Sequence, residues 1–321
     1  PAADVGTGAQ PLTMPRGSAP RVTALVAVAA AAVLFGTSGV ARGLLQQGAR
    51  HPDLGAVFVG SWRALIGGVG LVIAATVGRQ APWTFPVRPG WTILGGAAVI
   101  GYQLAFFAAA DRVGVGPAAV VTIGTGPVVA GLVDRFVFRT AVPTRWMVGV
   151  VVAVTGIVAL STGGADTAVP TGWAFAVAAG CCYPVYGLAA QRLMVDRPAL
   201  AAIATVFGAG AVFTLPVAVL ASRGSAGPHV DGGVVLLVAY LGLAATALAY
   251  GLWAIGLHRL TLSDTVAVTL AEPAAAVLLA AALLDEPLGG RAVAAMVVVL
   301  AGVLVATTTG SRPSGQEKAG Q

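Results

Sequence analysis

The sequence predicts an all-α integral membrane protein whose ten transmembrane helices form two inverted five-helix repeats. The chain has 321 residues, of which 57% are hydrophobic and only 9% are charged, and its mean hydropathy is +0.89. A soluble protein of this length needs more charge to cover its surface. Polar residues also divide the apolar ones into ten long stretches, and the sequence around Pro127 recurs around Pro273.

The ten apolar stretches are joined by short polar connections, so we expect no separate soluble domain. A helix needs about 20 apolar residues to cross the hydrocarbon core of a bilayer. Residues 1–21 and 310–321 are predicted to be disordered tails, and the first apolar run is too long for a signal-peptide core. The predicted spans are roughly 22–45, 54–78, 91–110, 117–138, 145–162, 171–193, 199–221, 233–256, 263–284 and 290–309.

The distribution of Lys and Arg predicts the orientation of these spans. With both termini inside, twelve basic residues lie at cytoplasmic positions and five lie outside, while Arg63 falls within the second span. Cytoplasmic loops of membrane proteins carry such an excess. We therefore expect a multi-pass protein of the inner or plasma membrane with both termini in the cytoplasm. The net charge of +6 then reflects these loops, because nucleic-acid binding would need a clustered basic face.

An internal repeat divides the chain into two halves, 22–162 and 171–309. Five is an odd number of spans, so the second half must be inverted relative to the first. Inverted repeats are a frequent transporter architecture, with the substrate site between the halves near mid-membrane. A chance match in a sequence rich in Ala and Val is the alternative. The matched pairs, each separated by 146 residues, are Pro127/Pro273, Arg145/Arg291 and Gly156/Gly302.

Several short motifs occur in an informative order along the chain. They are Phe35-Gly36-Thr37-Ser38, Ser61-Trp62-Arg63, the prolines of spans four and nine, and Asp285-Glu286-Pro287-Leu288. Together they resemble the drug/metabolite transporter superfamily, in its EamA-like branch, over nearly all of residues 22–309. The resemblance implies transport of small metabolites, often export, through a central cavity lined by the first four helices of each half. One departure follows span four, where Arg139-Thr140 occupies the positions that correspond to Asp285-Glu286 in the second half. An acidic residue at this place is therefore not required in both halves.

Two charged residues are predicted to lie deep in the membrane. Glu272 stands directly before Pro273 in span nine, and Arg63 lies in span two. Charges at that depth are costly and are usually kept for pairing, substrate or protons. One interpretation is a permanent salt bridge that locks two helices; the other is a pair of cavity residues that binds substrate or exchanges a proton. We hypothesise proton coupling through Glu272.

Polar and aromatic residues within other spans complete the predicted cavity. Binding sites combine apolar walls with a few polar anchors. For any single aromatic residue, core packing or an interfacial belt is the alternative. Pro127 and Pro273 are expected to kink their helices and free backbone carbonyls, unless they are ordinary membrane-helix prolines. The predicted cavity or coupling residues are Glu272, Arg63, Thr37, Ser38, Tyr102, Gln103, Tyr183, Tyr250 and Trp253.

The sequence gives little support to an enzyme. Gly36-Thr37-Ser38-Gly39 lacks the spacing of a nucleophile elbow, no paired His could bind a metal, and no phosphate-binding loop with Lys is present. We expect no cofactor and no metal. The predicted function is a secondary transporter, expected to export small metabolites such as amino acids or related compounds by alternating access. The alternatives are a facilitative or exchange carrier for another organic solute, or a non-transporting membrane scaffold. The sequence leaves substrate, direction, coupling ion and oligomeric state open.

Overall fold

In the computed structural model of this protein, helices are the only regular elements of the described residues, which are 21–47, 55–161, 170–223, 230–284 and 289–307. The predicted disordered tails lie outside these ranges, except that Arg21 already begins the first helix. The Asp285-Glu286-Pro287-Leu288 motif also lies outside them.

The first half of the chain forms five helices that follow the predicted spans closely. Pro89 begins the third of them, and Gly114 ends it with φ 87°, in the left-handed region that favours glycine. A short 3₁₀ turn, η1 (Pro82–Thr84), lies between the second and third. The five helices are α1 (Arg21–Gln47), α2 (Ala56–Val77), α3 (Pro89–Val113), α4 (Val115–Phe136) and α5 (Thr144–Ser161).

The second half also has five spans, but two of them are irregular. Span eight consists of α8 (Gly232–Gly242), a π-helical segment η2 (Leu243–Leu248) and α9 (Ala249–Leu257). Span nine is broken into α10 (Leu262–Thr269) and α11 (Glu272–Leu283). The regular spans are α6 (Pro170–Leu193), α7 (Ala199–Arg223) and α12 (Gly290–Thr307).

These segments confirm the prediction of ten spans. Within the described residues, nine helical segments are long and apolar enough to cross a membrane, and α5 contributes a shorter apolar helix. The Arg21 guanidinium donates a hydrogen bond to the Thr307 carbonyl at 3.1 Å, so α1 begins where α12 ends. An even number of spans requires the first helix to begin on the side of the membrane where the last helix ends. We call this end of the bundle the terminal side.

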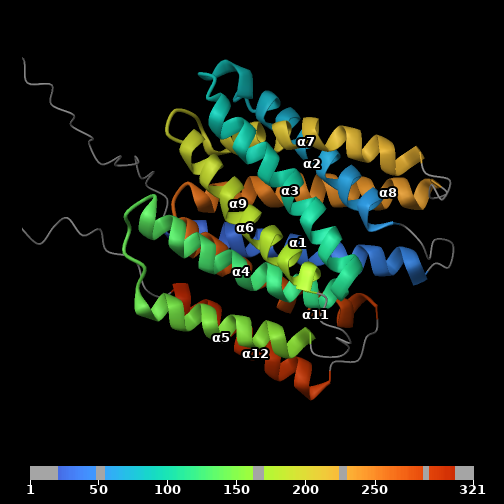
Figure 1. The fold of residues 1–321 in the computed structure, drawn as a ribbon, viewed down its shortest axis with the longest axis vertical. Helices are drawn as coiled ribbons and strands as arrows, with labels where there is room; N and C mark the ends of the chain where they lie inside the picture. The colour runs from blue at the N-terminus through green and yellow to red at the C-terminus, as the bar shows by residue number, and fades with distance from the viewer. Residues whose placement is uncertain (1–20, 48–54, 162–169, 224–229, 285–288, 308–321) are drawn as a thin grey trace, which may run out of the picture.

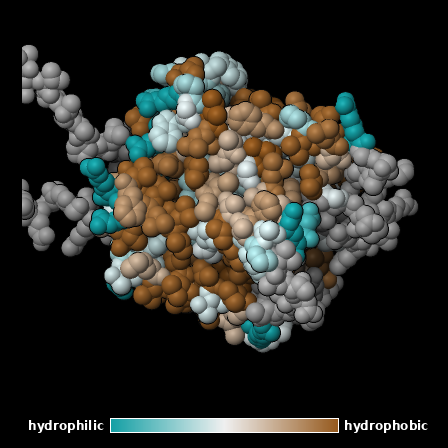
Figure 2. Space-filling model, in the orientation of Figure 1, coloured by the Kyte–Doolittle hydropathy of each residue, from teal (hydrophilic) through white to brown (hydrophobic). Residues whose placement is uncertain are grey.

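The exposed surface is that of a protein surrounded by lipid. Figure 2 shows a broad hydrophobic band across the visible face, with hydrophilic residues mostly near its margins. Leu236 on α8 and Val151 on α5 are 71% and 65% exposed. Exposed aliphatic side chains carry no free-energy penalty when the surrounding solvent is the hydrocarbon of a bilayer.

The fifth helices of the two halves, α5 and α12, pack together at one edge of the bundle (Figure 1). Glycine allows their backbones to approach. A Cβ added at Gly302 would lie 2.3 Å from the Ala153 amide nitrogen, and one at Gly149 would lie 2.4 Å from that of Ala306. Gly156, the repeat partner of Gly302, makes a similar contact with α12. Small residues of this kind drive close helix packing in membranes.

Candidate functional site

Glu272 lies at the break in span nine. It is the first residue of α11 and stands near the middle of the 22-residue span Leu262–Leu283. Pro273 follows it in the first turn of the helix, where its missing N–H is tolerated. The Glu272 side chain is half-buried. Irregular backbone at membrane depth is tolerated only where it is buried in protein or lines a water-filled cavity, so the break marks an inward-facing position.

Arg63 on α2 is held by the other irregular segment. Its Nε donates to the Thr246 hydroxyl at 2.9 Å, and its Nη2 donates to the Ala245 carbonyl at 3.4 Å. Both acceptors belong to η2, and the Thr246 hydroxyl itself donates to the Leu241 carbonyl at 2.8 Å. π-Helical turns are frequent at functional sites because they alter the regular backbone bonding. Here the turn presents oxygens to a guanidinium inside the membrane.

The two intramembrane charges do not form a direct salt bridge. Arg63 and Glu272 are both described, and no ion pair joins them in this structure. Both charges nevertheless lie within electrostatic range of the Tyr102 and Tyr250 phenols. Of the two interpretations offered above, the locked ion pair is therefore not what this structure contains. The charges flank a common region.

A cluster of aromatic rings forms a wall beside this region. The Tyr186 and Tyr250 hydroxyls are 2.7 Å apart, and Tyr250 packs against Phe207 and Phe35 with centroid distances of 4.1 and 4.9 Å. The rings of Tyr183 and Trp253 also belong to it, at 5.9 Å from each other. Trp253 is fully buried, which makes it a packing residue, whereas Tyr183 and Tyr250 keep partial exposure.

Tyr102 and Gln103 lie together on α3 but differ in their contacts. Gln103 donates to the Gly60 carbonyl at 2.8 Å and so ties α3 to the helix that carries Arg63. Tyr102 stacks on Phe106 of its own helix, and its phenol lies within electrostatic range of the two charges. Gln103 therefore links two helices, whereas Tyr102 is the residue of this pair nearer in electrostatic terms to both charges.

Thr37 on α1 lines a groove, and neither Thr37 nor its neighbour Ser38 is hydrogen-bonded to Arg63 or Glu272. Thr37 donates to the Leu34 carbonyl at 2.6 Å and accepts from the Tyr240 hydroxyl at 2.8 Å. The Ser38 hydroxyl is buried and has no hydrogen-bond partner among the described groups. The groove, of about 480 Å³, is almost wholly apolar. It is lined by Thr37, Val40, Ala41, Leu44, Gly233, Leu236, Leu237, Tyr240, Leu279 and Leu283.

Two stretches of the chain, residues 22–162 and 170–308, each match the EamA-like transporter family. The chain belongs to the EamA-like transporter family. An uncharacterized transporter of Bacillus subtilis (strain 168), YwfM, is 28% identical over 286 residues, covering 86% of this chain and 90% of its own. One crystal structure of a protein shares the fold with a TM-score of 0.75 and 23% identity, covering 90% of this chain and 98% of that one.

Family membership identifies this EamA-like protein as a membrane transporter and confirms the resemblance stated from its motifs. Each intramembrane charge comes from a different family repeat, because Arg63 lies in the first matched stretch and Glu272 in the second. The candidate site of the EamA-like chain is thus built between its halves, where inverted-repeat transporters bind their substrates.

The two prolines of the EamA-like chain behave differently. Helix α4 continues through Pro127 from Val115 to Phe136, whereas span nine is interrupted just before Pro273. At the break, the Tyr183 hydroxyl donates to Thr269 at 3.0 Å and so fixes the end of α10 to α6. Thr269 could not be predicted from the sequence, because it reaches the site only through the packing of helices distant in the chain.

Proposed function

We propose that this EamA-like protein is a secondary transporter that exports small polar or amphipathic metabolites across the plasma membrane by alternating access. Amino acids and related compounds are the leading substrate class. The observation that carries the proposal is the separation of Arg63 from Glu272. The two opposite charges, one from each half, flank one aromatic-walled region without contacting each other.

Charges held apart in this way are available to a ligand. Arg63 is hydrogen-bonded to two neutral oxygens, so its positive charge is uncompensated at short range. Among the described residues, the Glu272 carboxylate has no hydrogen-bond or ion-pair partner. A zwitterion could place a carboxylate toward Arg63 and an ammonium toward Glu272, which would repay part of the cost of burying both charges. The aromatic wall would contact the apolar part of such a solute.

Proton coupling fits the same carboxylate. Glu272 lies near the middle of its span, whereas Asp111, Asp134 and Asp264 lie close to helix ends. A carboxylate that faces the substrate region can exchange a proton for a substrate ammonium, because both neutralise it. Alternating access would then carry protons in one direction and substrate in the other.

The test is transport by purified protein in proteoliposomes with a panel of radiolabelled amino acids. Glu272→Gln keeps the size and hydrogen-bonding capacity of the side chain but cannot ionise. We expect this variant to lose accumulation driven by a pH gradient and to keep part of the exchange at equal pH. The control is Asp111→Asn, which neutralises an exposed carboxylate at the end of α3 and should leave flux unchanged.

The other outcomes separate the alternatives. Gradient-driven accumulation by Glu272→Gln at the wild-type rate would refute coupling through this residue and favour facilitated diffusion or exchange. If the wild-type protein moves no organic solute in this assay, a non-transporting scaffold becomes the better description.

A further inference from the structure

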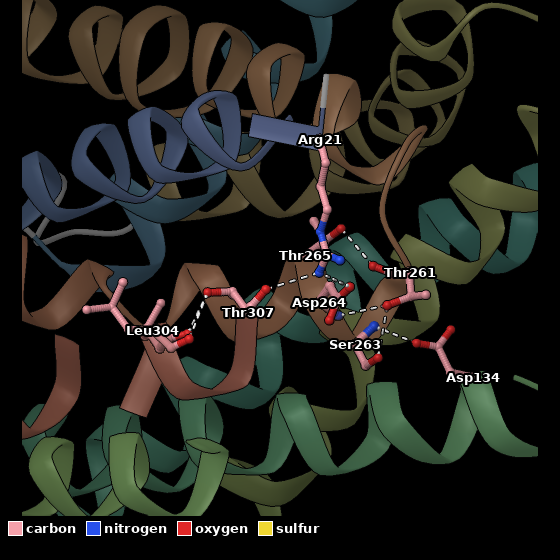
Figure 3. Close-up of polar contacts among 9 residues, drawn as sticks. Arg21, Asp134, Thr261, Ser263, Asp264, Thr265, Leu304 and Thr307 are labelled. Atoms are coloured by element: carbon pink, nitrogen blue, oxygen red, sulfur yellow. Dashed lines mark hydrogen bonds and ion pairs between the residues drawn. The ribbon is translucent and has the colours of Figure 1, made fainter. Parts of the chain in front are cut away.

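A second group of polar side chains, none of them among the candidate-site residues, lies at the terminal side (Figure 3). We call it the end cluster. Four helices contribute to it, two from each half: α1 at its beginning, α4 at its end, α10 at its beginning and α12 at its end. Its members are Arg21, Asp134, Thr261, Ser263, Asp264 and Thr307.

The end cluster joins these helices by charged hydrogen bonds. The Arg21 Nη2 lies 3.2 Å from the Asp264 Oδ2 and 3.1 Å from the Thr307 carbonyl oxygen (Figure 3). The Asp134 Oδ2 accepts the backbone N–H of Ser263 at 2.7 Å. Helix α1 is thereby tied to α10 and α12, and α4 is tied to α10. Hydrogen bonds to ionised groups are stronger than neutral ones.

Both carboxylates of the end cluster are buried, which is unusual for the end of a membrane span. Asp134 is 2% exposed and Asp264 is 6% exposed. Charged residues at span ends ordinarily reach water. The four helix ends converge around these two carboxylates and shield them in this structure, while the Arg21 side chain stays partly exposed.

The end cluster is linked to the candidate site by one short helix. Thr261 caps α10 by accepting the N–H of Asp264 at 3.1 Å, and all eight residues of α10 are buried. The same helix ends at Thr269, next to the break before Glu272. Since α10 is only about two turns long, a movement of its first turn must displace its last turn. Opening the end cluster would therefore move the backbone beside Glu272.

The opposite end of the bundle has no matching charges at the repeat-related positions. The 146-residue offset pairs Asp134 with Ala280, each near the end of its span, and Asp264 with Ala118, each near the beginning of its span. Because the halves are inverted, the two alanines lie at the opposite end of the bundle. The apolar groove lined by Leu44, Gly233 and Leu283 lies at that end. Among the described residues, the two ends therefore differ at these repeat-related positions, with carboxylates at the terminal side and alanines at the opposite end.

We propose that the end cluster is the gate of the terminal side, and that its Arg21–Asp264 and Asp134–Ser263 bonds break each time the substrate region opens there. This inference rests on the alternating access of the proposed function. A permanent clamp, which would hold the helices together throughout the cycle, is the rival, and it predicts no labelling of the buried thiol described next from the terminal side while Arg21, Asp134 and Asp264 are intact.

The experiment measures how fast a buried thiol behind the gate reacts. Thr265 is completely buried, one turn inside the end cluster, and becomes the reporter as Thr265→Cys in a chain whose Cys181 and Cys182 are replaced by Ala. Purified protein in liposomes is treated with a membrane-impermeant maleimide applied to each face in turn. We expect Asp264→Asn, which removes the charge that pairs with Arg21, and Asp134→Ala, which removes the acceptor of the Ser263 N–H, each to raise the labelling rate from the terminal side by about tenfold or more.

The matched control breaks a different ion pair at the same end. Arg88, just before α3, and Arg197 both pair with Asp196 in the connection after α6. Helix α3 already packs extensively on both α6 and α7, so Asp196→Asn should lower thermal stability and leave labelling unchanged. Combining Arg21→Asp with Asp264→Arg should restore protection from labelling. If Asp264→Asn does not fold, Arg21→Gln takes its place.

Three results would overturn the gate. They are unchanged labelling in the Asp264, Asp134 and Arg21 variants, an equal rise in Asp196→Asn, and a rise only from the opposite face. The labelling needs no substrate, so a failure of the gate can be told apart from a failure of the proposed function. Faster labelling in a protein that moves no solute would leave the gate standing and reject the transport proposal, whereas active transport with unchanged labelling would reject the gate alone.

Discussion

Arg63 keeps its charge inside the membrane without a carboxylate in contact, because span eight supplies two oxygens to it. Its position could be predicted, since one guanidinium in a long apolar run is conspicuous. Its partners Ala245 and Thr246 could not, because nothing in that part of the sequence marks a π-helical turn. The burial of Asp134 and Asp264 could not be predicted from the sequence either. It depends on the packing of helices far apart in the chain, which brings Arg21 to Asp264 and Ser263 to Asp134.

Replacing Arg63 with Met should separate a structural from a functional role. The change removes a costly buried charge and two hydrogen bonds, while the Thr246 hydroxyl keeps its bond to Leu241. We expect the free energy of unfolding to change by less than about 2 kcal/mol, while substrate flux falls by at least about tenfold because a ligand carboxylate loses its partner. Thermal unfolding in detergent and flux in proteoliposomes measure the two effects.

A loss of about 3–5 kcal/mol in that variant, as expected when one member of a buried ion pair is removed, would favour a direct Arg63–Glu272 salt bridge in the membrane. Trp62→Phe is a suitable control. It lies next to Arg63 and gives up one exposed hydrogen bond, to Ser222.

Asp196 should contribute stability that depends on pH. Burial alone would raise the pKa of this carboxyl, but hydrogen bonds from Arg197 and Arg88 outweigh it and hold the pKa below its ordinary value. The stabilisation is therefore present above the unfolded pKa of about 3.9 and is lost as the pH falls through the folded pKa. Relative to Asp196→Asn, the wild-type protein should be more stable by a constant amount from pH 5 to 8, and this difference should shrink below about pH 4.

Unfolding curves of the wild-type protein and Asp196→Asn at a series of pH values test whether the difference in stability shrinks toward low pH. A difference that grows toward low pH would contradict the arrangement of Arg88 and Arg197 around the carboxylate.

The helices themselves were largely predictable, because the thickness of the bilayer sets their length and charged or Pro- and Gly-rich connections set their ends. All ten predicted spans lie within a few residues of the observed segments. Pro273 indicated the interruption of span nine. Helix α4, however, continues without a break through the repeat-related Pro127. Proline alone therefore does not decide where a span breaks, since neighbouring helices can satisfy the freed backbone groups.

The α5–α12 contact should not tolerate a larger side chain at its centre. Gly302→Val would place a Cβ 2.3 Å from the Ala153 nitrogen, so the backbones must separate. We expect a loss of about 1–3 kcal/mol in unfolding free energy, measured by thermal unfolding. Gly251→Ala is the matched control, because a Cβ at this helical glycine meets nothing within 4 Å. It should be neutral or stabilising. Equal losses in the two variants would show that close packing is not the cause.

The whole bundle depends on contacts between its halves, which no local pattern in the sequence describes. The internal repeat predicted that two halves exist and that a site lies between them. It did not predict that, among the described residues, the irregular helical spans would be spans eight and nine, nor that buried carboxylates at the terminal side would have alanines as their repeat partners. These differences arise where the two halves have diverged at matched positions, as at Asp134 and Ala280.

The orientation of the bundle can be tested directly. The excess of Lys and Arg predicts that both termini lie in the cytoplasm. In a chain free of other cysteines, a thiol introduced at Ser314 should resist an impermeant reagent in intact cells, and one introduced at Asp166, between the halves, should react. The reverse result would invert the orientation and assign the end cluster to the outer face of the membrane.

The contact between Arg21 and Thr307 has a further consequence for the order of the polypeptide. Because the beginning of the first helix touches the end of the last, a short linker could join them, and the chain could be opened between residues 161 and 170. Such a circular permutant would keep every helix contact while placing the second half first. Its new ends would lie on the opposite face, so its leading helix would have to insert in the other direction. If the permutant fails to assemble, the order of the two halves along the polypeptide is set by synthesis and membrane insertion and not by the packing of the finished bundle.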